Sequence, residues 1–249
     1  MKEKPRKVYR HGYHSLMSSS KKTFWTETLP ERLPPDPLEI ASQWLAQAQR
    51  EAAQPNPDAM VLATVDGRDY PSARVVLCKE IAVQQGYLLF YTNYLSRKGS
   101  ELQSNPRAAV VFHWDHLHRQ VRAEGQVQGL SDAENDTYFR TRHWQKQVGA
   151  WASQQSQPVQ SREALVAAVA REARRFGISY DGPGSAEPEH IAVQVPRPPN
   201  WGGYRLYVDA VELWVEGEYR IHDRARWTRA LVNGRTDPAA AWSSTRLQP

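Results

Sequence analysis

The chain has 249 residues, of which 40% are hydrophobic and 24% are charged, and its formal net charge at pH 7 is +5. Residues 1–22 hold seven of the 32 basic residues and only one acid, Glu3, so the rest of the chain carries 25 basic and 26 acidic groups. The body of the protein is therefore close to neutral. This argues against a protein built around a nucleic-acid-binding face, which would gather Lys and Arg on folded elements.

No membrane association is expected, because the longest apolar run, residues 164–170, is too short for a transmembrane helix. No hydrophobic signal-peptide core follows Met1. The single Cys78 excludes an internal disulfide framework and is typical of a reducing compartment, so we expect a cytoplasmic protein.

The first part of the chain, residues 1–35, is rich in charge, serine and proline, and we expect a mobile arm. Residues 36–249 are expected to form a single domain, with residues 178–199 as a long insertion rich in Gly and Pro. Asp36 as N-cap and Pro37 at the first helical position predict a helix. Four apolar residues at helical spacing predict the face that this helix packs on the body: Leu38, Ala41, Leu45 and Ala48.

Five short segments predict strands, since they are apolar or alternate between polar and apolar residues and are separated by turn-forming residues. They span residues 59–65, 73–79, 87–91, 108–114 and 120–128. Most of the connections between them are too short for a crossover helix. The sequence therefore predicts a mainly β protein with flanking helices, in which the strands form an antiparallel barrel rather than a parallel sheet.

Two further helices are predicted after the strands. Ser131 opens a capping box for a helix that ends near Arg142, and Ser161 caps a helix over residues 162–176. The inner positions of the second helix are expected to be Leu165, Val169 and Ala170. Residues 204–215 are typical of a strand, and residues 216–218 are typical of a hairpin turn that leads into a last strand over residues 219–222.

Most general catalytic signatures are absent from the sequence. It has no Gly-x-Ser-x-Gly, no phosphate-binding loop with Gly-Lys-Ser/Thr and no His-Glu-x-x-His. His113, His116 and His118 form the only histidine cluster, and their spacing favours ordinary histidines at a strand end over metal ligands. We therefore expect no metal site.

Pairs of cations recur at predicted strand ends and tight loops. Three of these pairs are Arg74 with Lys79, Arg97 with Lys98, and Arg142 with Lys146. Arg220, His222 and Arg224 alternate, so they would point to one side of a strand. Guanidinium and ammonium groups bind phosphate well, although each pair alone also fits a solvated strand end. Together, and beside Trp and Tyr, they suggest a phosphorylated aromatic ligand.

The order of short motifs in the sequence resembles the pyridoxamine 5′-phosphate oxidase family over about residues 36–249. The resemblance is carried by Arg74–Lys79, Phe90–Asn93, Ser96–Lys98, Asn105–Arg107, Arg119–Val121, Tyr138–Phe139, Gly149–Trp151, Gln155–Ser156, Trp201–Gly203, Glu212–Trp214, Arg220–Arg224 and Arg246–Pro249. The resemblance implies an FMN-binding split β-barrel that forms a homodimer, with FMN at the interface between the subunits.

The resemblance also implies roles for individual residues. The FMN contacts would be Arg74, Val75, Val76, Leu77, Cys78, Lys79, Tyr91, Thr92, Arg97, Lys98, Gln120, Gln155, Ser156, Trp214 and Arg224. The phosphorylated pyridine substrate would be bound by Lys79, Tyr138, Arg142 and Lys146, with Arg220 and His222 as catalytic residues that orient the pyridine ring.

The reaction that the resemblance implies is oxidation of pyridoxamine or pyridoxine 5′-phosphate. A hydride passes from the C4′ carbon of the substrate to N5 of the flavin, and O2 then reoxidises the flavin, giving pyridoxal 5′-phosphate and H2O2. The flavin supplies the redox chemistry, and the protein supplies alignment and charge.

Three features depart from the family pattern. Lys146 stands where the family has a phosphate-binding Ser, the segment from residue 178 to about residue 196 is longer than usual, and Arg10 with Tyr13 is the only candidate for the N-terminal lid. Two alternatives therefore stay open at this point. One is a related flavin oxidase that acts on another aromatic compound, as in phenazine biosynthesis, and the other is a flavin-binding module without catalysis that uses the basic arm as a nucleic-acid anchor.

Overall fold

The structure is a computed structural model that describes residues 27–180, 182, 193–237 and 240–249. Arg10 and Tyr13, the predicted lid, lie outside the described residues, as do residues 181 and 183–192 of the predicted insertion. The helices are α1 (Pro37–Glu51), α2 (Arg97–Ser104), α3 (Asp132–Arg140), α4 (Trp144–Ala152), α5 (Arg162–Arg175) and the short 3₁₀ turns η1 (Asp115–Leu117) and η2 (Glu218–Arg220). The strands are β1 (Ala59–Val65), β2 (Pro71–Ala82), β3 (Tyr87–Asn93), β4 (Arg107–Trp114), β5 (Arg119–Gly129), β6 (Trp201–Val215), β7 (Asp223–Thr228), β8 (Leu231–Val232), β9 (Arg235–Thr236) and β10 (Ser243–Leu247).

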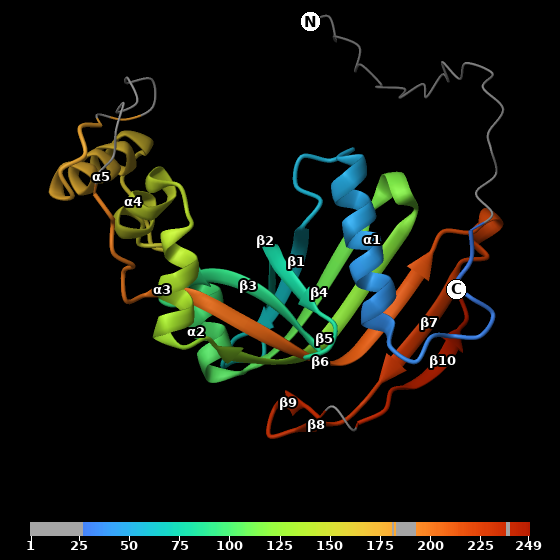
Figure 1. The fold of residues 1–249 in the computed structure, drawn as a ribbon. Coiled ribbons are helices and arrows are strands. Elements are labelled where there is room, and N and C mark those ends of the chain that lie inside the picture. The colour runs from blue at the N-terminus through green and yellow to red at the C-terminus, as the bar shows by residue number, and fades with distance from the viewer. Residues whose placement is uncertain (1–26, 181, 183–192, 238–239) are drawn as a thin grey trace, which may run out of the picture.

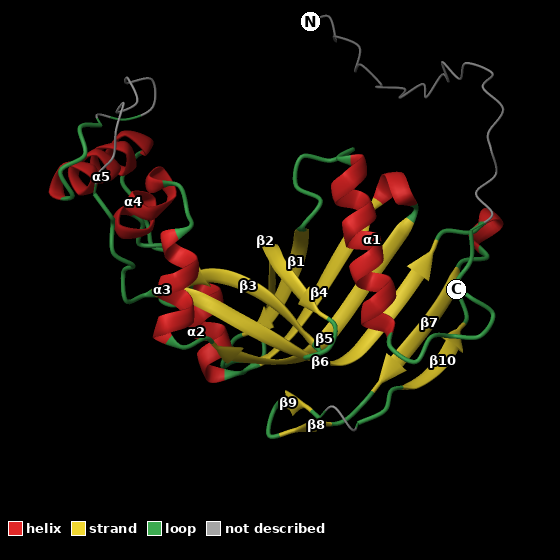
Figure 2. Ribbon diagram, viewed as in Figure 1, coloured by secondary structure: helices red, strands yellow, loops and turns green. Residues whose placement is uncertain are grey.

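The predicted antiparallel barrel is confirmed. Six strands follow one another in the order β6-β3-β2-β1-β4-β5, and a further antiparallel pairing of β5 with β6 closes the ring (Figure 2). β6 pairs with β5 along one edge and with two strands along the other edge. Its first half pairs with β3 and its second half pairs with β7. β10 pairs with β7 and extends the sheet beyond the barrel (Figure 1).

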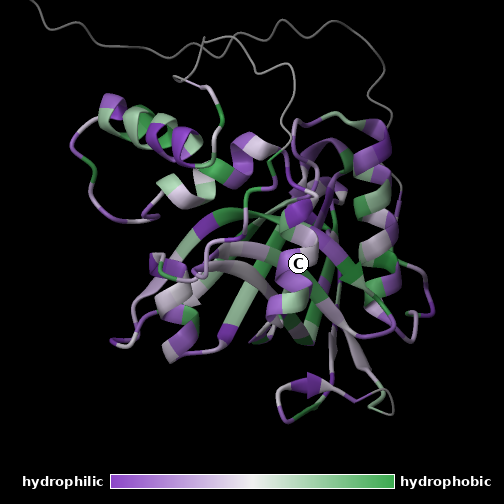
Figure 3. Ribbon diagram, turned by 60° about the vertical axis from the view of Figure 1, so that its left-hand side comes forward, coloured by the Kyte–Doolittle hydropathy of each residue, from purple (hydrophilic) through white to green (hydrophobic). Residues whose placement is uncertain are grey.

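The barrel and α1 share one hydrophobic core. On β5 the predicted alternation holds, since Val121, Ala123 and Val127 are buried between polar neighbours. The helix begins as predicted, because Oδ1 of Asp36 accepts a 2.8 Å hydrogen bond from the amide of Leu38. All four predicted apolar positions of α1 are buried in the same core, and Figure 3 shows the hydrophobic colour running along the barrel strands.

α4 and α5 pack on each other at one end of the barrel, beside α3 (Figure 1). Their small core contains Val148, Ala173 and Ile178. α3 carries the predicted capping box at Ser131, and Ser161 caps α5 through the amide of Ala164. Leu165 was predicted as an inner position of α5, and this was wrong: its side chain is exposed, and Ala170 and Ala173 are the buried positions of α5.

The segment after β6 differs from the sequence prediction. Residues 219–222 form no strand; Tyr219 and Arg220 have φ values of 53° and 66° within η2, and β7 begins only at Asp223. Gly217 allows this tight turn, because a Cβ atom there would lie 1.8 Å from the carbonyl oxygen of Ile221. Arg220, His222 and Arg224 therefore do not share a strand face.

Within the described part of the chain, no helix has the length and apolar character needed to cross a membrane.

Candidate functional site

A cleft of about 770 Å³ opens between β2, β3, the start of α2 and the helices α3 and α4. This volume is in the range of small-molecule and cofactor sites. Its lining residues are Arg74, Val75, Val76, Leu77, Lys79, Tyr91, Thr92, Asn93, Lys98, Tyr138, Thr141, Arg142, His143, Lys146, Gly149, Ala150, Ser153, Gln155 and Trp201. Five of these described lining residues are Arg or Lys and none is Asp or Glu, so the cleft is suited to an anionic ligand.

β2 forms one wall of the cleft and carries Lys79 on a β-bulge. The pairing register with β3 shifts between Cys78 and Glu80, which leaves Lys79 as the extra residue. Its ammonium group donates a 2.9 Å hydrogen bond to Oδ2 of Asp58. The neighbouring Cys78 faces the core, and burial raises the pKa of its thiol to about 12. Only the backbone of Cys78 could therefore contact a ligand in the cleft, and its thiol stays protonated.

The start of α2 places a second cation in the cleft. Ser96 caps the helix through the amide of Gly99, and Lys98 follows in the first turn. Nζ of Lys98 donates a 2.8 Å hydrogen bond to Oε1 of Gln155, which also accepts a 3.3 Å hydrogen bond from Thr92. Burial lowers the pKa of Lys98, and the nearby guanidinium of Arg74 lowers it further.

Arg74 is fixed by a polar network beneath the same end of the cleft. Its Nη2 atom donates a 3.0 Å hydrogen bond to Glu101, whose carboxylate also accepts hydrogen bonds from Thr64, Ser72 and Arg97. Burial by itself would raise the pKa of Glu101, but these hydrogen bonds outweigh burial and lower that pKa to about 2. Glu101 is therefore ionised at neutral pH.

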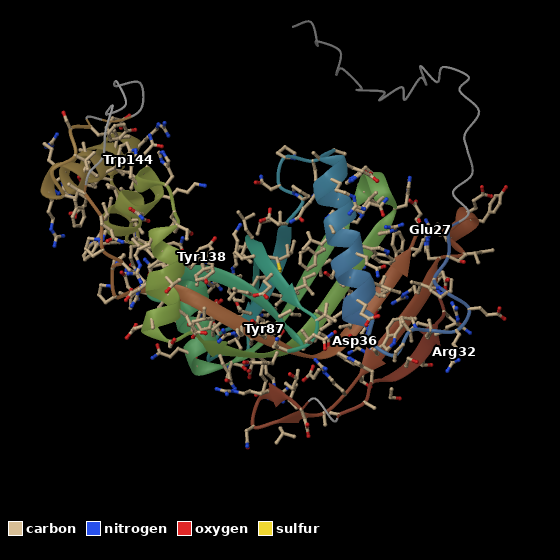
Figure 4. The ribbon with its side chains drawn as sticks, viewed as in Figure 1. Glu27, Arg32, Asp36, Tyr87, Tyr138 and Trp144 are labelled. Carbon is tan, nitrogen blue, oxygen red and sulfur yellow. The ribbon has the colours of Figure 1, made fainter. Side chains whose placement is uncertain are left out.

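Part of the cleft lining is a stack of aromatic rings. The rings of Tyr91 and Tyr138 stack with 3.9 Å between centroids, and Tyr91 lies parallel to Trp201 at 5.1 Å. Figure 4 shows Tyr138 on α3 beside the barrel, whereas Trp144 lies farther out with α4 and α5. Gly203 permits the stack, since a Cβ atom there would lie 2.8 Å from the ring of Tyr91. Burial, and then the neighbouring Tyr138, raise the pKa of Tyr91 to about 12, so its hydroxyl is neutral.

Arg142 is a partly buried cation of the cleft that packs on an aromatic ring. Its guanidinium lies 4.5 Å from the ring centre of Trp201, and its Nη1 atom is buried without a hydrogen-bond partner among the residues that the structure describes. Burial lowers the pKa of this guanidinium, although an arginine remains protonated. A buried donor without a partner is costly, so this position fits a ligand that supplies an acceptor.

The cleft brings together most of the residues expected to bind cofactor and substrate. On the cofactor side these are Arg74, Val75, Val76, Leu77, Lys79, Tyr91, Thr92, Lys98 and Gln155, and on the substrate side Lys79, Tyr138, Arg142 and Lys146. Arg97 does not line it; its side chain is 59% exposed and pairs with Glu101. Ser156 lies in the turn after α4 and lines a separate groove toward α5.

The remaining candidates form a second group away from the cleft, defined here as Gln120, Trp214, Arg220, His222 and Arg224. Gln120 pairs with Trp214 across β5 and β6, and Trp214 pairs with Arg224 across β6 and β7, so these three share one face of the sheet. The ring of His222 lies 4.8 Å from that of Trp214, and Arg220 stands in the adjoining η2 turn. None of the five lines the cleft.

Several residues of the cleft were not predicted as site residues. They are Asn93, Thr141, His143, Gly149, Ala150, Ser153 and Trp201, and most of them lie on or beside α4, a helix that was not predicted. The spacing of Trp144, Val148 and Trp151 is helical and was the available signal for α4. Glu101 was also missed, because a single acid in a polar segment carries no signal of burial.

Comparison with known proteins gives consistent results. Residues 45–175 match the family model described as pyridoxamine 5′-phosphate oxidase, and residues 201–249 match that of the pyridoxine 5′-phosphate oxidase C-terminal dimerisation region. The pyridoxine/pyridoxamine 5′-phosphate oxidase of Rhodopseudomonas palustris (strain HaA2) is 44% identical over 219 residues, covering 86% of this chain and 90% of that protein. The protein of the same name from Paracoccus denitrificans (strain Pd 1222) is 41% identical over 226 residues, covering 86% and 95%.

Solved structures agree in fold. PhzG from Burkholderia lata 383, in complex with tetrahydrophenazine-1-carboxylic acid, has a TM-score of 0.70 and 30% identity, covering 87% of this chain and 94% of that one. A pyridoxamine 5′-phosphate oxidase-related, FMN binding protein from Nostoc punctiforme PCC 73102 has a TM-score of 0.60 at 16% identity, covering 86% and 97%, and shows a likeness of fold alone. From its sequence matches and its barrel, the chain belongs to the pyridoxamine 5′-phosphate oxidase family of FMN-dependent oxidoreductases.

Proposed function

We propose that the protein oxidises pyridoxine 5′-phosphate or pyridoxamine 5′-phosphate to pyridoxal 5′-phosphate in the cytoplasm, with FMN as cofactor, O2 as electron acceptor and H2O2 as product. The observation that carries the proposal is the cleft with five cations and no acid among its described lining residues. Such a lining suits two phosphorylated ligands, the cofactor and the substrate. The names of relatives that are 41–44% identical support the same reaction.

The residues of the cleft fit FMN. Arg74 and Lys98 would hold its phosphate beside the first turn of α2, where backbone amides also favour an anion. The exposed side chains of Val75 and Leu77 provide an apolar surface for a flat ring, and Thr92 with Gln155 supplies hydroxyl and amide partners. Bound FMN would supply the redox chemistry, as acceptor of the hydride from C4′ of the substrate and donor of electrons to O2.

The substrate would be bound by the other cations of the cleft. Within the described residues Arg142 offers a buried donor without a partner, and Lys146 and Tyr138 line the same cleft. These groups would bind the substrate phosphate and exclude water from it, while Arg220 and His222 orient the pyridine ring. When the substrate is the amine, water supplies the aldehyde oxygen and ammonia is released.

The separation of the second group from the cleft supports a homodimer in which two chains build each FMN site. Val61 and Val75 face each other across β1 and β2 and are exposed, as is Leu77, so an apolar strip borders the cleft. A second copy that covers this strip would bring its own Gln120, Trp214 and Arg224 to the cofactor. The match to a C-terminal dimerisation region supports this arrangement.

The first test is the visible absorbance of the purified protein, followed by a peroxide assay with pyridoxine 5′-phosphate and pyridoxamine 5′-phosphate. We expect a yellow protein that releases one H2O2 for each pyridoxal 5′-phosphate formed. A colourless protein that FMN does not reconstitute would contradict the proposal.

Sharing of the site is tested by co-expressing two variants, Lys98→Met in the cleft and Arg220→Lys in the second group. Each variant alone should be nearly inactive. If two chains build each site, random pairing gives one intact site in each mixed dimer and about a quarter of the wild-type activity. Activity no higher than that of the single variants would instead place each site within one chain.

A second candidate function is oxidation of a tricyclic aromatic acid. It is favoured by the likeness to PhzG from Burkholderia lata 383 and by Lys146, whose ammonium group in the cleft is suited to a carboxylate. The same peroxide assay with tetrahydrophenazine-1-carboxylic acid separates the two functions. Turnover of this acid without turnover of either pyridine phosphate would favour the second candidate.

A further inference from the structure

Glu101 is a buried carboxylate on α2 that joins three elements beneath the cleft without lining it. Its side chain is only 3% exposed, and it accepts hydrogen bonds from Thr64 on β1, from Ser72 and Arg74 on β2, and from Arg97 in its own helix. A buried carboxylate without partners would be strongly unfavourable, so this set of donors is what allows the charge to stay there.

The network leaves Arg74 little freedom. Nη1 of Arg74 donates to the carbonyl oxygen of Leu62 at 3.2 Å and to the hydroxyl of Thr64, and Nη2 donates to Ser72 and, at 3.0 Å, to Glu101. All four Nη hydrogens therefore have acceptors within the protein. Only the Nε hydrogen and the positive charge remain for a ligand in the cleft. The orientation of Arg74 is thus set before a ligand arrives.

The same carboxylate fixes the start of α2. Glu101 lies one turn after Lys98, and its hydrogen bonds to Thr64 and Ser72 hold the helix against the β1–β2 hairpin. The helix is also close to the preceding loop, because a Cβ atom at Gly99 would lie 2.1 Å from the carbonyl oxygen of Tyr94. The first turn of α2 and the Arg74 guanidinium are therefore held in one fixed relation.

We propose that Glu101 is a positioning residue that holds Arg74 and the first turn of α2 in the arrangement that binds the phosphate of FMN. This inference rests on the proposed function, which assigns that end of the cleft to the cofactor phosphate. For the FMN affinity of a variant without this carboxylate, the inference predicts the opposite of what the charge of Glu101 alone would predict. Removing a negative charge near an anion site should tighten phosphate binding by Coulomb's law, whereas loss of positioning should weaken it.

The test compares FMN with riboflavin, which has the same ring but no phosphate. Dissociation constants of both flavins are measured for the apoprotein of the wild type, of Glu101→Gln and of the control Glu124→Gln. Glu124 also pairs with arginines, Arg122 and Arg226, but lies outside the cleft. In Glu101→Gln we expect the Kd for FMN to rise about ten- to hundred-fold and that for riboflavin to stay unchanged, whereas the control keeps both values.

A double-variant cycle tests whether Glu101 acts through Arg74. In an Arg74→Met background, Glu101→Gln should raise the Kd for FMN much less than it does alone.

Unchanged or tighter FMN binding by Glu101→Gln overturns the inference, as does a lower melting temperature with an unchanged preference for FMN over riboflavin. If Glu101→Gln does not fold, Ser72→Ala removes a hydroxyl bound to both residues, and an unchanged preference there also overturns it. A wild-type protein that binds neither flavin overturns the proposed function itself, and the inference with it.

Discussion

Nζ of Lys98, in the first turn of α2, lies 2.8 Å from Oε1 of Gln155, in the turn that follows α4. This hydrogen bond connects the barrel side of the cleft with its helical side. Burial lowers the pKa of Lys98 and the charge of Arg74 lowers it further, whereas the charge of Glu101 acts in the opposite direction. The cation at this point is therefore easier to deprotonate than an ordinary lysine.

A pH dependence of cofactor binding follows from this lowered pKa. Lys98 carries its charge below its folded pKa and loses it as the pH rises through that value, so FMN affinity should fall on the alkaline side at a lower pH than an exposed lysine would give. Lys98→Arg should remove this alkaline loss, because an arginine stays protonated. Fluorescence titration with FMN measures the affinity of both proteins between about pH 6 and pH 10, which is about the range in which such a lysine loses its proton. The same dependence of FMN affinity on pH in the wild type and in Lys98→Arg would refute the prediction.

Arg220→Lys is expected to lower kcat on the order of 10²-fold while FMN remains bound. Arg220 offers a planar cation from a turn where its φ is 66°. A flexible ammonium group could not stack on the substrate ring or present fixed donors as a guanidinium would. Stopped-flow measurement of flavin reduction by pyridoxine 5′-phosphate gives the rate of hydride transfer from the substrate to the bound flavin. Arg226→Lys, on β7 and paired with Glu124, is the matched control. Near-normal turnover of Arg220→Lys would remove this residue from the mechanism.

Lys146→Ser introduces the residue that the family pattern has at this position. We expect KM for the phosphorylated pyridines to rise by about ten-fold with kcat little changed, because a charge that binds substrate phosphate is lost. Lys146→Arg retains the charge and should keep KM near that of the wild type. A KM that falls in Lys146→Ser would show that Lys146 serves another ligand group.

Gly203→Ala should disturb the stack of aromatic rings. The new Cβ atom would lie 2.8 Å from the ring of Tyr91, which must then leave its stack on Tyr138. We expect a loss of about 1–3 kcal/mol in the free energy of unfolding and weaker FMN binding. Gly129→Ala, where no atom of the described residues lies within 4 Å of the new Cβ, is the control. Equal stability of the two variants in urea would contradict the expectation.

The acid stability of the protein should depend on Glu101. Its pKa is about 2 in the folded protein, below the ordinary value of 4.5, so its contribution to stability is complete above pH 4.5 and is lost as the pH falls toward 2. The free energy of unfolding of the wild type should therefore fall across this interval, and that of Glu101→Gln should fall less. Urea unfolding at a series of pH values measures the difference, and equal slopes would contradict it.

The sequence predicted the barrel well because its strands carry their own signals. Strand β1 was predicted with its observed ends, and the buried alternation of β5 was visible in Val121, Ala123 and Val127. Asp36 and Ser131 marked helix starts that the structure confirms. These features are local, so the residues that cause them are adjacent in the chain.

Other features depended on contacts between distant residues and were not predictable in this way. The eight residues of α2 contain one apolar side chain, Leu102, and the helix is held by the hydrogen bonds of Glu101 to other elements. The alternation from Arg220 to Arg224 suggested a strand, but the amide of Gly217 donates to Nδ1 of His222 and closes a turn instead. Division of the candidate residues into a cleft and a second group also requires knowledge of the closed barrel.

β6 has a consequence for communication within the proposed dimer. Trp201 opens this strand in the wall of the cleft, and Trp214 stands near its other end in the second group. Nearly the full 15-residue strand lies between them, about 43 Å measured along the chain at about 3.3 Å per residue. If each active site takes its cleft from one chain and its second group from the other, a single hydrogen-bonded strand runs from one active site to the other. A shift of β6 along its axis on ligand binding would then reach both sites of the dimer. Ligand bound at one site could in this way change the ligand affinity of the other site.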